Sequence, residues 1–173
     1  MLLQSFLDYL LLEKNYSELT IKAYGKDIQS FLDFLKEEYK NENLKEVNYA
    51  QIRSWIIQMV NQNISNRSIN RKISSLNSFF KFLIKTEYIK TNPLAKHKAL
   101  KTSKKVQVPF SEEEINSVLN KISHADSFEG VRNKLIIELF YATGIRRIEL
   151  INIKVKNIDL ESKTVKILGK RNK

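Results

Sequence analysis

The sequence has little of several residue types that shape small proteins. Its 173 residues include no cysteine, 2 prolines, 4 glycines and 2 histidines. The lack of cysteine excludes disulfide bonds and thiolate metal sites. His97 and His124 have no carboxylate or second histidine at ligand spacing, so we interpret both as surface or linker residues and expect no metal site. The scarcity of glycine and proline leaves room for long helices.

Long apolar runs are also missing. No run approaches the ~18 residues of a membrane-spanning helix. Residues 1–8 lack the basic region and the uninterrupted apolar core of a signal peptide. Hydrophobic residues still make up 42% of the chain, which is enough for a core. We therefore expect a soluble, cytoplasmic protein with no segment that spans a membrane.

Acidic residues are too few to balance the basic ones. The chain has 19 Asp and Glu against 30 Lys and Arg, which gives a formal net charge of +11. This charge favours a polyanionic partner, either nucleic acid or an anionic membrane surface. A basic protein with no such partner is the plain alternative.

Residues 1–92 repeat one helical pattern four times. Apolar residues recur at spacings of three and four over about 2–14, 18–40, the stretch after 48, and about 65–88. Asn48, followed three residues later by Gln51, predicts a capping box that starts the third helix. Asn92-Pro93 then ends the helical pattern. Four amphipathic helices in this length predict a small helical bundle.

The polar face at the start of the fourth helix is basic and contains no acid. Hydroxyl and amide groups beside arginines suit the major groove or the phosphate backbone of DNA. Together with the net charge, this pattern favours a DNA-binding face over an ordinary solvated one. The candidate contacts on this helix are Ser65, Asn66, Arg67, Ser68, Asn70, Arg71, Lys72 and Ser75, and the second helix adds Lys22 and Lys26.

Residues 93–108 have no apolar periodicity and are rich in lysine, so we interpret them as a basic linker. A lysine-rich connector between two modules that grip one polyanion adds affinity by releasing counterions. Lys101, Lys104 and Lys105 are the candidate DNA contacts here. A plain flexible tether is the alternative.

Residues 109–173 begin a second unit. Ser111 and Glu114 form another capping box, and two helical stripes follow, the second starting near Asp126-Ser127 and ending at Thr143-Gly144. A short helix over 146–151 comes next. The stretches 157–160 and 164–168 alternate as the two strands of a short antiparallel hairpin.

Residues 141–150 carry the candidate chemistry. Arg146, Arg147 and Glu149 follow directly on the glycine that ends a helix. A buried arginine held by a carboxylate one turn later is what a phosphate clamp needs, because the guanidinium offers paired N–H donors and the acid orients it. The residues alone predict no more than such a phosphate clamp.

Several motifs resemble the tyrosine recombinases, most closely the Xer-type and related phage-type integrases. In the second unit they are Tyr141-Ala142-Thr143-Gly144-Ile145-Arg146, Glu149-Leu150, Ile158-Asp159 and Gly169-Lys170-Arg171-Asn172-Lys173. In the bundle they are Thr20, Tyr24, the stretch 65–75 and Phe79-Phe80-Lys81-Phe82-Leu83. The resemblance implies a mainly α fold, with a four-helix SAM-like core-binding bundle and the start of an α+β catalytic domain.

The resemblance also implies a reaction. In that family a tyrosine attacks the scissile phosphate and forms a 3′-phosphotyrosyl link, with no metal or nucleotide cofactor. By motif, Arg146 would be the first catalytic arginine, Glu149 its supporting acid and Lys170 the general acid. Arg147 would be a DNA-backbone or surface contact, and Thr20 and Tyr24 would join the DNA contacts. The implied partner is a double-stranded recombination site, bound by a full-length tetramer on two sites, with no membrane partner and no small-molecule substrate.

The sequence departs from the family at two points. Arg171 stands where the family usually has glycine, which puts the choice of Lys170 over Lys173 in doubt. The family's His-x-x-Arg box and tyrosine nucleophile do not occur in the chain. We therefore expect an amino-terminal fragment, truncated inside the catalytic domain, that binds DNA without cutting it. A natural, non-catalytic DNA-binding protein derived from a recombinase, and a helical scaffold for acidic proteins, are the alternatives.

Overall fold

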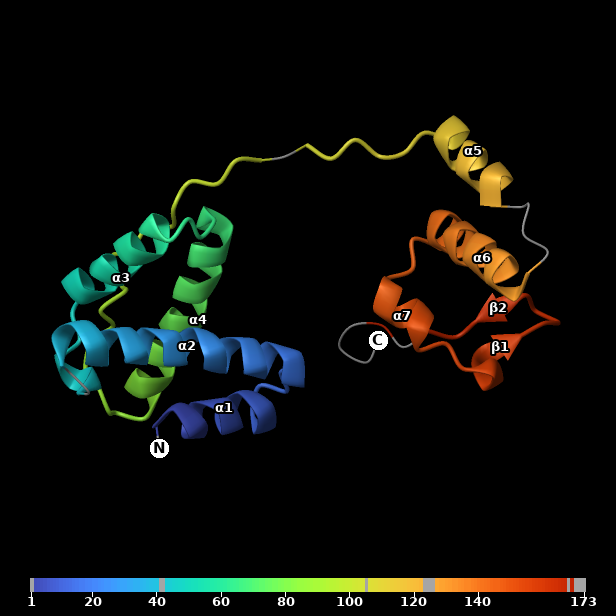
Figure 1. The fold of residues 1–173 in the computed structure, drawn as a ribbon. Helices are drawn as coiled ribbons and strands as arrows, with labels where there is room; N and C mark the ends of the chain where they lie inside the picture. Colours follow the sequence, from blue (N-terminus) through green and yellow to red (C-terminus); the bar gives the residue numbers. More distant parts are fainter. Residues whose placement is uncertain (1, 41–42, 105, 123–126, 168, 170–173) are drawn as a thin grey trace. The chain divides into compact units, whose positions relative to one another are not determined.

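The computed structural model describes residues 2–40, 43–104, 106–122, 127–167 and 169. The chain divides into two compact units, residues 1–105 and residues 106–173 (Figure 1).

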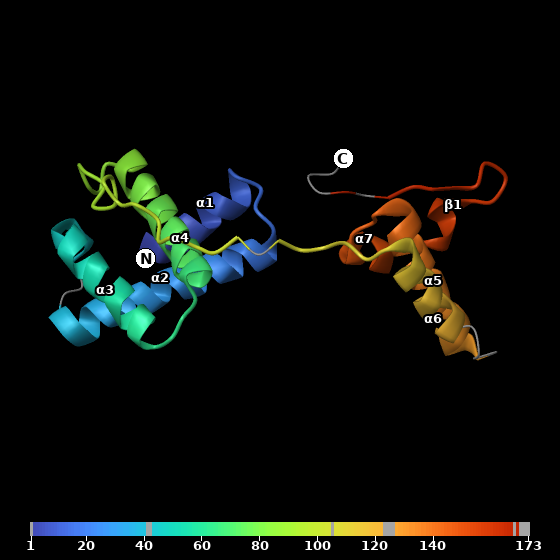
Figure 2. The same ribbon diagram turned by 90° about the horizontal axis from the view of Figure 1, so that it is seen from above.

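The first unit is a bundle of four helices. They are α1 (Leu2–Leu12), α2 (Glu18–Tyr39), α3 (Tyr49–Asn61) and α4 (Asn66–Lys85), with a 3₁₀ turn, η1 (Leu44–Glu46), before α3. Helix α2 lies across α4 in both views of the ribbon (Figures 1 and 2). The bundle expected from the sequence is confirmed.

Side chains at the helix starts explain why the helices begin where they do. Ser17 and Ser65 accept hydrogen bonds from the backbone N–H three residues on, which satisfies one of the free donors of α2 and α4. Asn48 and Gln51 form the expected capping box at α3. Helix α4 ends three residues earlier than expected, because Thr86 bonds back to the Phe82 carbonyl and Glu87 has a left-handed φ of 58°.

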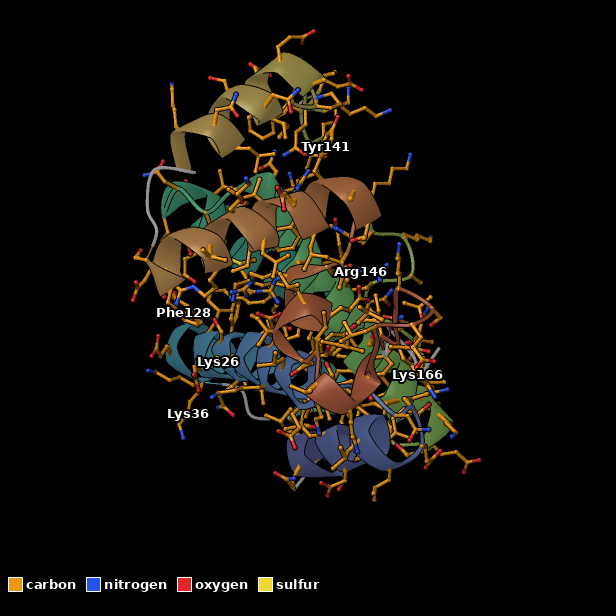
Figure 3. The ribbon with its side chains drawn as sticks, turned by 90° about the vertical axis from the view of Figure 1, so that its right-hand side faces the viewer. Lys26, Lys36, Phe128, Tyr141, Arg146 and Lys166 are labelled. Carbon is orange, nitrogen blue, oxygen red and sulfur yellow. The ribbon has the colours of Figure 1, made fainter. Side chains whose placement is uncertain are left out.

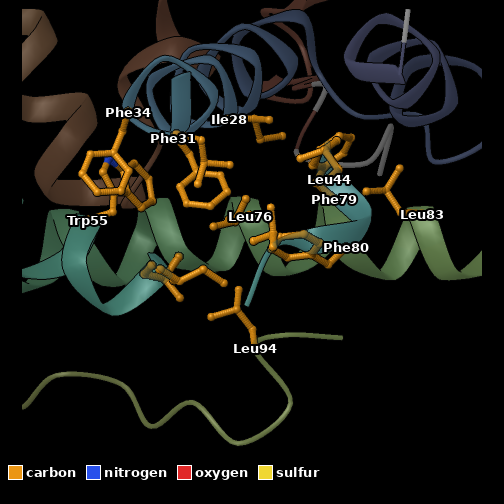
Figure 4. Close-up of a cluster of buried hydrophobic side chains, with 14 of the residues drawn as sticks. Ile28, Phe31, Phe34, Leu44, Trp55, Leu76, Phe79, Phe80, Leu83 and Leu94 are labelled. Atoms are coloured by element: carbon orange, nitrogen blue, oxygen red, sulfur yellow. The ribbon is translucent and has the colours of Figure 1, made fainter. Parts of the chain in front are cut away.

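The core of the bundle is aromatic. Phe6, Phe31, Trp55, Phe79 and Phe80 are all at most 2% exposed and come from all four helices. Figure 4 shows Phe31 and Trp55 together between α2 and α4, and their ring centroids lie 5.1 Å apart. Each large apolar side chain buried in this way stabilises the fold by about 1.5–3 kcal/mol. The core thus sets the positions of the polar faces of α2 and α4.

The segment 92–101 differs from the linker expected there, because it packs on the bundle. Leu94 is buried, at 5% exposed, and Asn92 donates a hydrogen bond to Asn77 of α4 over 2.8 Å. His97, expected on the surface, is half-buried, with Nδ1 3.3 Å from the Tyr49 hydroxyl. We call residues 92–101 the docked segment.

The second unit contains three helices and a hairpin. They are α5 (Glu112–Ile122), α6 (Phe128–Thr143), α7 (Arg147–Ile151), a 3₁₀ turn, η2 (Val155–Asn157), and the strands β1 (Ile158–Asp159) and β2 (Thr164–Val165). The strands pair antiparallel, with Ile158 opposite Val165, as the expected hairpin requires. Helix α5 packs beside α6.

Apolar side chains of the second unit remain largely open. Among its described residues only Gly130 is buried. Phe128 is 76% exposed, Val155 87% and Leu160 84%. Its elements therefore rest on local hydrogen bonds more than on a shared core. In the part of the chain that the structure describes, no helix combines the length and the apolar character needed to cross a membrane.

Candidate nucleic-acid interface and arginine site

Three kinds of contact occupy the face of α4 that was expected to meet DNA. The first is the cap: Ser65 Oγ accepts from the Ser68 N–H over 3.3 Å and donates to Ser68 Oγ over 3.0 Å. The primary role of both serines is therefore to cap the start of α4. Arg67 is exposed and has no polar partner among the described residues, so it is open to a ligand.

Two asparagines one turn apart hold the docked segment. Asn70 donates Nδ2 to the Leu100 carbonyl over 2.8 Å and accepts the Leu100 N–H over 2.9 Å. Asn66 donates to the Lys101 carbonyl over 2.8 Å. The Asn70 amide pairs with Leu100 much as a neighbouring strand would. The Asn70 amide is thus already used inside the bundle, and a contact between Asn70 and DNA stays a prediction.

A buried carboxylate occupies the third part of this face. Asp27 of α2 has a side chain only 3% exposed and lies against α4. Its Oδ2 accepts from Arg71 Nη1 and from Ser75 Oγ over 2.9 Å. Its Oδ1 accepts from Arg71 Nη2 over 2.9 Å and from Lys72 Nζ over 3.2 Å. We call Asp27, Arg71, Lys72 and Ser75 the Asp27 cluster.

The Asp27 cluster changes the interpretation of Ser75. This side chain was expected among the DNA contacts, but it is 1% exposed and its hydroxyl binds Asp27. Ser75 is therefore a structural partner of the carboxylate. Sequence reasoning overlooked Asp27 itself. The available signal was its place on the apolar stripe of α2, three residues after Tyr24 and four before Phe31, where an acid has to be paired.

The candidate contacts on α2 line the helix from its start. The Thr20 hydroxyl lies 2.9 Å from Ser17 Oγ, and the Tyr24 ring packs edge-on against Tyr16 at 5.9 Å. Lys22 and Lys26 are exposed, and Lys26 projects from α2 in Figure 3. Of the candidate contacts on α2, these two lysines are the exposed cations that an anionic ligand can reach.

Lys101 is the last residue of the docked segment, and Lys104 and Lys105 follow it. Lys101 is exposed while its carbonyl is held by Asn66, and Lys104 is exposed as well. Lys105 lies outside the described residues. The docked segment thus brings the Lys101 backbone to the first turn of α4, close to Arg67.

The arginine motif forms a compact local structure in the second unit. Helix α6 ends at Gly144, whose φ of 63° is left-handed, and the Ile145 N–H donates to Thr143 Oγ1 over 3.2 Å. Arg146 follows as the residue before α7 (Figure 3). Its backbone N–H donates to Glu149 Oε2 over 3.0 Å, and its Nη1 donates to Glu149 Oε1 over 2.6 Å.

The Glu149 carboxylate therefore accepts hydrogen bonds from both the backbone and the side chain of Arg146. The backbone hydrogen bond from Arg146, followed by the hydrogen bond and charge of its guanidinium, lowers the pKa of Glu149 from its ordinary value. The expected acid–arginine clamp is present, but the arginine is not buried: its side chain is 66% exposed. An exposed and oriented guanidinium can bind a phosphate oxygen directly.

The remaining basic groups of this unit have less defined places. Arg147 is exposed, without a polar partner among the described residues. Lys170 lies outside the described residues. No group of three or more His, Asp or Glu side chains within the described ranges is placed to hold a metal ion.

The fold and these two sites define a protein that joins a basic helical bundle to an α+β unit with a carboxylate-held arginine. Residues 3–87 match the phage integrase N-terminal SAM-like domain, and residues 111–173 match the phage integrase family. The chain therefore belongs to the phage integrase family, the tyrosine recombinases. The resemblance found in the sequence motifs is confirmed.

Similar proteins of the same family are longer than this chain. It is 38% identical over 171 residues to tyrosine recombinase XerC of Anoxybacillus flavithermus, covering 99% of this chain and 56% of that protein. It is also 38% identical over 170 residues to tyrosine recombinase XerC of Staphylococcus epidermidis, covering 98% of this chain and again 56% of the relative. The chain thus spans little more than half the length of these relatives.

Solved structures show the same fold at lower identity. The Tn1549 transposon integrase, solved in complex with circular intermediate DNA, has a TM-score of 0.71 and 20% identity over 95% of this chain and 52% of that one. The integrase from mycobacterium phage Brujita has a TM-score of 0.53 and 21% identity over 98% of this chain and 54% of that one.

Proposed function

We propose that the first unit binds double-stranded DNA through the exposed basic groups of α2, α4 and the docked segment. These are Lys22, Lys26, Arg67, Arg71, Lys101 and Lys104, and the partly buried Lys72 lies beside Arg71. Their charge, and the net charge of +11, supply the counterion-release term that dominates affinity for duplex DNA. The tyrosine recombinase family, and a neighbour of the same fold solved with DNA, support this assignment.

The full-length protein, in this proposal, is a site-specific tyrosine recombinase. A tyrosine oxygen forms a bond to the scissile phosphorus while the bond to the 5′ oxygen breaks, which leaves a 3′-phosphotyrosyl link. The released 5′ oxygen takes up a proton and becomes a hydroxyl group. Rejoining reverses the step on another strand. Assembly as a tetramer on two DNA sites and the use of Lys170 as the proton donor belong to the same proposal.

The observation that carries the proposal is the Arg146–Glu149 clamp. The negative charge on the transferring phosphoryl group grows as the tyrosine attacks, and a guanidinium aimed at its non-bridging oxygens stabilises that charge. Glu149 holds the guanidinium from one side and leaves most of it exposed. Donors that are already oriented need no rearrangement at the moment of reaction, which is where their catalytic effect arises.

This chain by itself, we infer, binds DNA without cutting it. Six of its seven tyrosines lie in the first unit, and the seventh, Tyr141, lies on α6 outside the motif in which the family carries its nucleophile. A non-catalytic DNA-binding protein derived from a recombinase is the competing proposal. The two differ in whether the gene encodes a tyrosine motif after Lys173.

The test uses the full-length protein, a duplex recombination site with a nick that traps the covalent intermediate, and the variants Arg146→Ala and Arg147→Ala. Arg146→Ala is expected to lower formation of the covalent protein–DNA complex by about 10²-fold or more, while affinity for the duplex changes little. Arg147→Ala is the matched control and should retain the complex. Gel electrophoresis measures the covalent product, and fluorescence anisotropy measures binding.

Wild-type amounts of the trapped complex in Arg146→Ala would refute the role of Arg146. Absence of duplex binding by the wild-type protein at low salt would refute the DNA-binding proposal and support a scaffold for acidic proteins.

A further inference from the structure

The Asp27 cluster holds more positive than negative charge. One carboxylate faces the Arg71 guanidinium and the Lys72 ammonium, so the cluster keeps one unit of positive charge. All four of its contacts join α2 to α4 across more than forty residues of sequence. The carboxylate accepts two hydrogen bonds on each oxygen, which fills its usual capacity.

The exposure of the three charged groups is uneven. The side chain of Asp27 is 3% exposed and that of Lys72 20%, whereas that of Arg71 is 53% exposed. The guanidinium uses one N–H of each terminal nitrogen on Asp27, which leaves three of its five donors for another ligand. Arg71 is therefore fixed along one edge and open along the others.

An ion pair whose carboxylate is buried in this way is poorly explained by stability alone. Replacing such a pair with apolar side chains of similar volume is often neutral or stabilising. The pair instead fixes the orientation of the Arg71 guanidinium, because a two-point contact to a buried carboxylate restricts an otherwise flexible arginine. A guanidinium held in one orientation loses less conformational entropy when it binds a ligand.

We propose that Asp27 is a positioning residue that holds Arg71 in the orientation in which it binds a phosphate of the DNA backbone. The inference rests on the proposed DNA-binding function of the first unit. The fitting partner is a phosphodiester, because a planar guanidinium with donors to spare pairs with two phosphate oxygens at once. Lys26, the residue before Asp27, and Lys72 line the same hollow of the bundle, so further positive charge lies beside this contact.

The alternative roles of Asp27 predict different changes in DNA affinity when Asp27 is replaced. If Asp27 only joins the helices, its loss lowers the melting temperature and leaves the DNA affinity of the folded protein unchanged. If Asp27 instead withholds Arg71 from DNA, removing the negative charge increases affinity. A positioning role predicts a loss of affinity despite the gain in net positive charge.

The experiment measures affinity for a fluorescently labelled duplex by anisotropy over a salt series. It compares the intact protein with Asp27→Asn, Arg71→Ala and the double variant. Asp33→Asn is the matched control, because Asp33 is an exposed acid on the same helix. Circular dichroism establishes that each variant is folded at the temperature of the binding measurement.

Under the proposal, Asp27→Asn and Arg71→Ala each weaken binding by about tenfold, to a similar extent on unrelated duplex sequences, and each lowers the salt slope by about one. The double variant binds as weakly as Arg71→Ala alone. Asp33→Asn binds at least as tightly as the wild type.

Affinity that is unchanged or increased in folded Asp27→Asn would overturn the inference, as would losses that simply add in the double variant. Where Asp27→Asn fails to melt cooperatively, Asp27→Glu keeps the charge and displaces the guanidinium by one methylene group. Its affinity is then expected to fall, and an unchanged value overturns the inference. If the wild type itself does not bind duplex DNA, the proposed function fails. If the wild type binds and Asp27 has no effect, only this inference fails.

Discussion

The two units contain similar elements but differ in how their apolar residues are used. In the first unit, stripes on four helices meet and bury rings such as Phe31 and Trp55 completely. In the second unit, well-formed helices leave Phe128 and Val131 more than 60% exposed. Caps and turns alone can therefore define the elements of this chain, whereas a core requires several stripes to face one another.

The same difference separates the two arginine–carboxylate pairs. Arg71 reaches Asp27 across a helix–helix interface, and the acid is buried. Arg146 reaches Glu149 within one turn of the chain, and the arginine is exposed. One pair depends on the tertiary fold and the other on local geometry, so they should respond differently to perturbation.

The largest expected effect comes from removing matched aromatic rings from the two units. Phe31→Ala leaves a cavity among buried rings and should lower the free energy of unfolding of the first unit by about 3–5 kcal/mol. Phe128→Ala removes an exposed ring and should change stability by less than about 0.5 kcal/mol. In urea denaturation, Trp55 fluorescence reports on the first unit and circular dichroism reports on the helices of both units. Equal effects would show that the second unit has a core of its own.

The docked segment tests where the first unit ends. Asn70→Ala removes both hydrogen bonds to Leu100, so the Leu100 amide should exchange its hydrogen about tenfold faster, as measured by NMR. Asn66→Ala is the control, since Asn66 bonds the Lys101 carbonyl and not the Leu100 amide among the described residues, so this amide should stay protected. Unchanged exchange in Asn70→Ala would mean that the segment is a free linker, as the sequence had indicated.

The smallest expected effect is the pH response of the local pair. Arg146 lowers the pKa of Glu149, so the folded form binds fewer protons than the unfolded form. The stabilisation of α7 by this carboxylate is therefore complete above the ordinary value of 4.5 and is lost as the pH falls through the lowered pKa. Arg146→Ala keeps the backbone N–H and removes the guanidinium, so the pKa of Glu149 should move only part of the way back towards 4.5, as followed by the ¹³C shift of its carboxyl carbon.

Asp159 is the internal control for that titration. Hydrogen bonds from Ser162, with a further one from the Glu161 N–H, lower its pKa without any arginine. Its titration should be the same in Arg146→Ala. A Glu149 titration that does not respond to the loss of Arg146 would contradict the clamp.

Much of the fold could be predicted from the sequence because its signals are local. Apolar periodicity located the four helices of the bundle, and short patterns such as Asn48 with Gln51 located their starts. The turn at Gly144 and the contact between Arg146 and Glu149 follow from a few consecutive residues in the same way. The exposure of Arg146 did not follow from the motif, because burial depends on what surrounds the motif and not on the motif itself.

The amino-acid sequence by itself determined the helices, the caps, the basic character and the family motifs, since each depends on residues within a turn or two of one another. Only the tertiary structure decided which polar groups on α4 are free. Asp27 accepts hydrogen bonds from Ser75 and from one edge of Arg71, and Leu100 of the docked segment bonds Asn70. These partners lie thirty or more residues away along the chain, and no local pattern pairs them. Packing of the aromatic core brings them together, because burying those rings leaves α2, α4 and the docked segment only one way to meet.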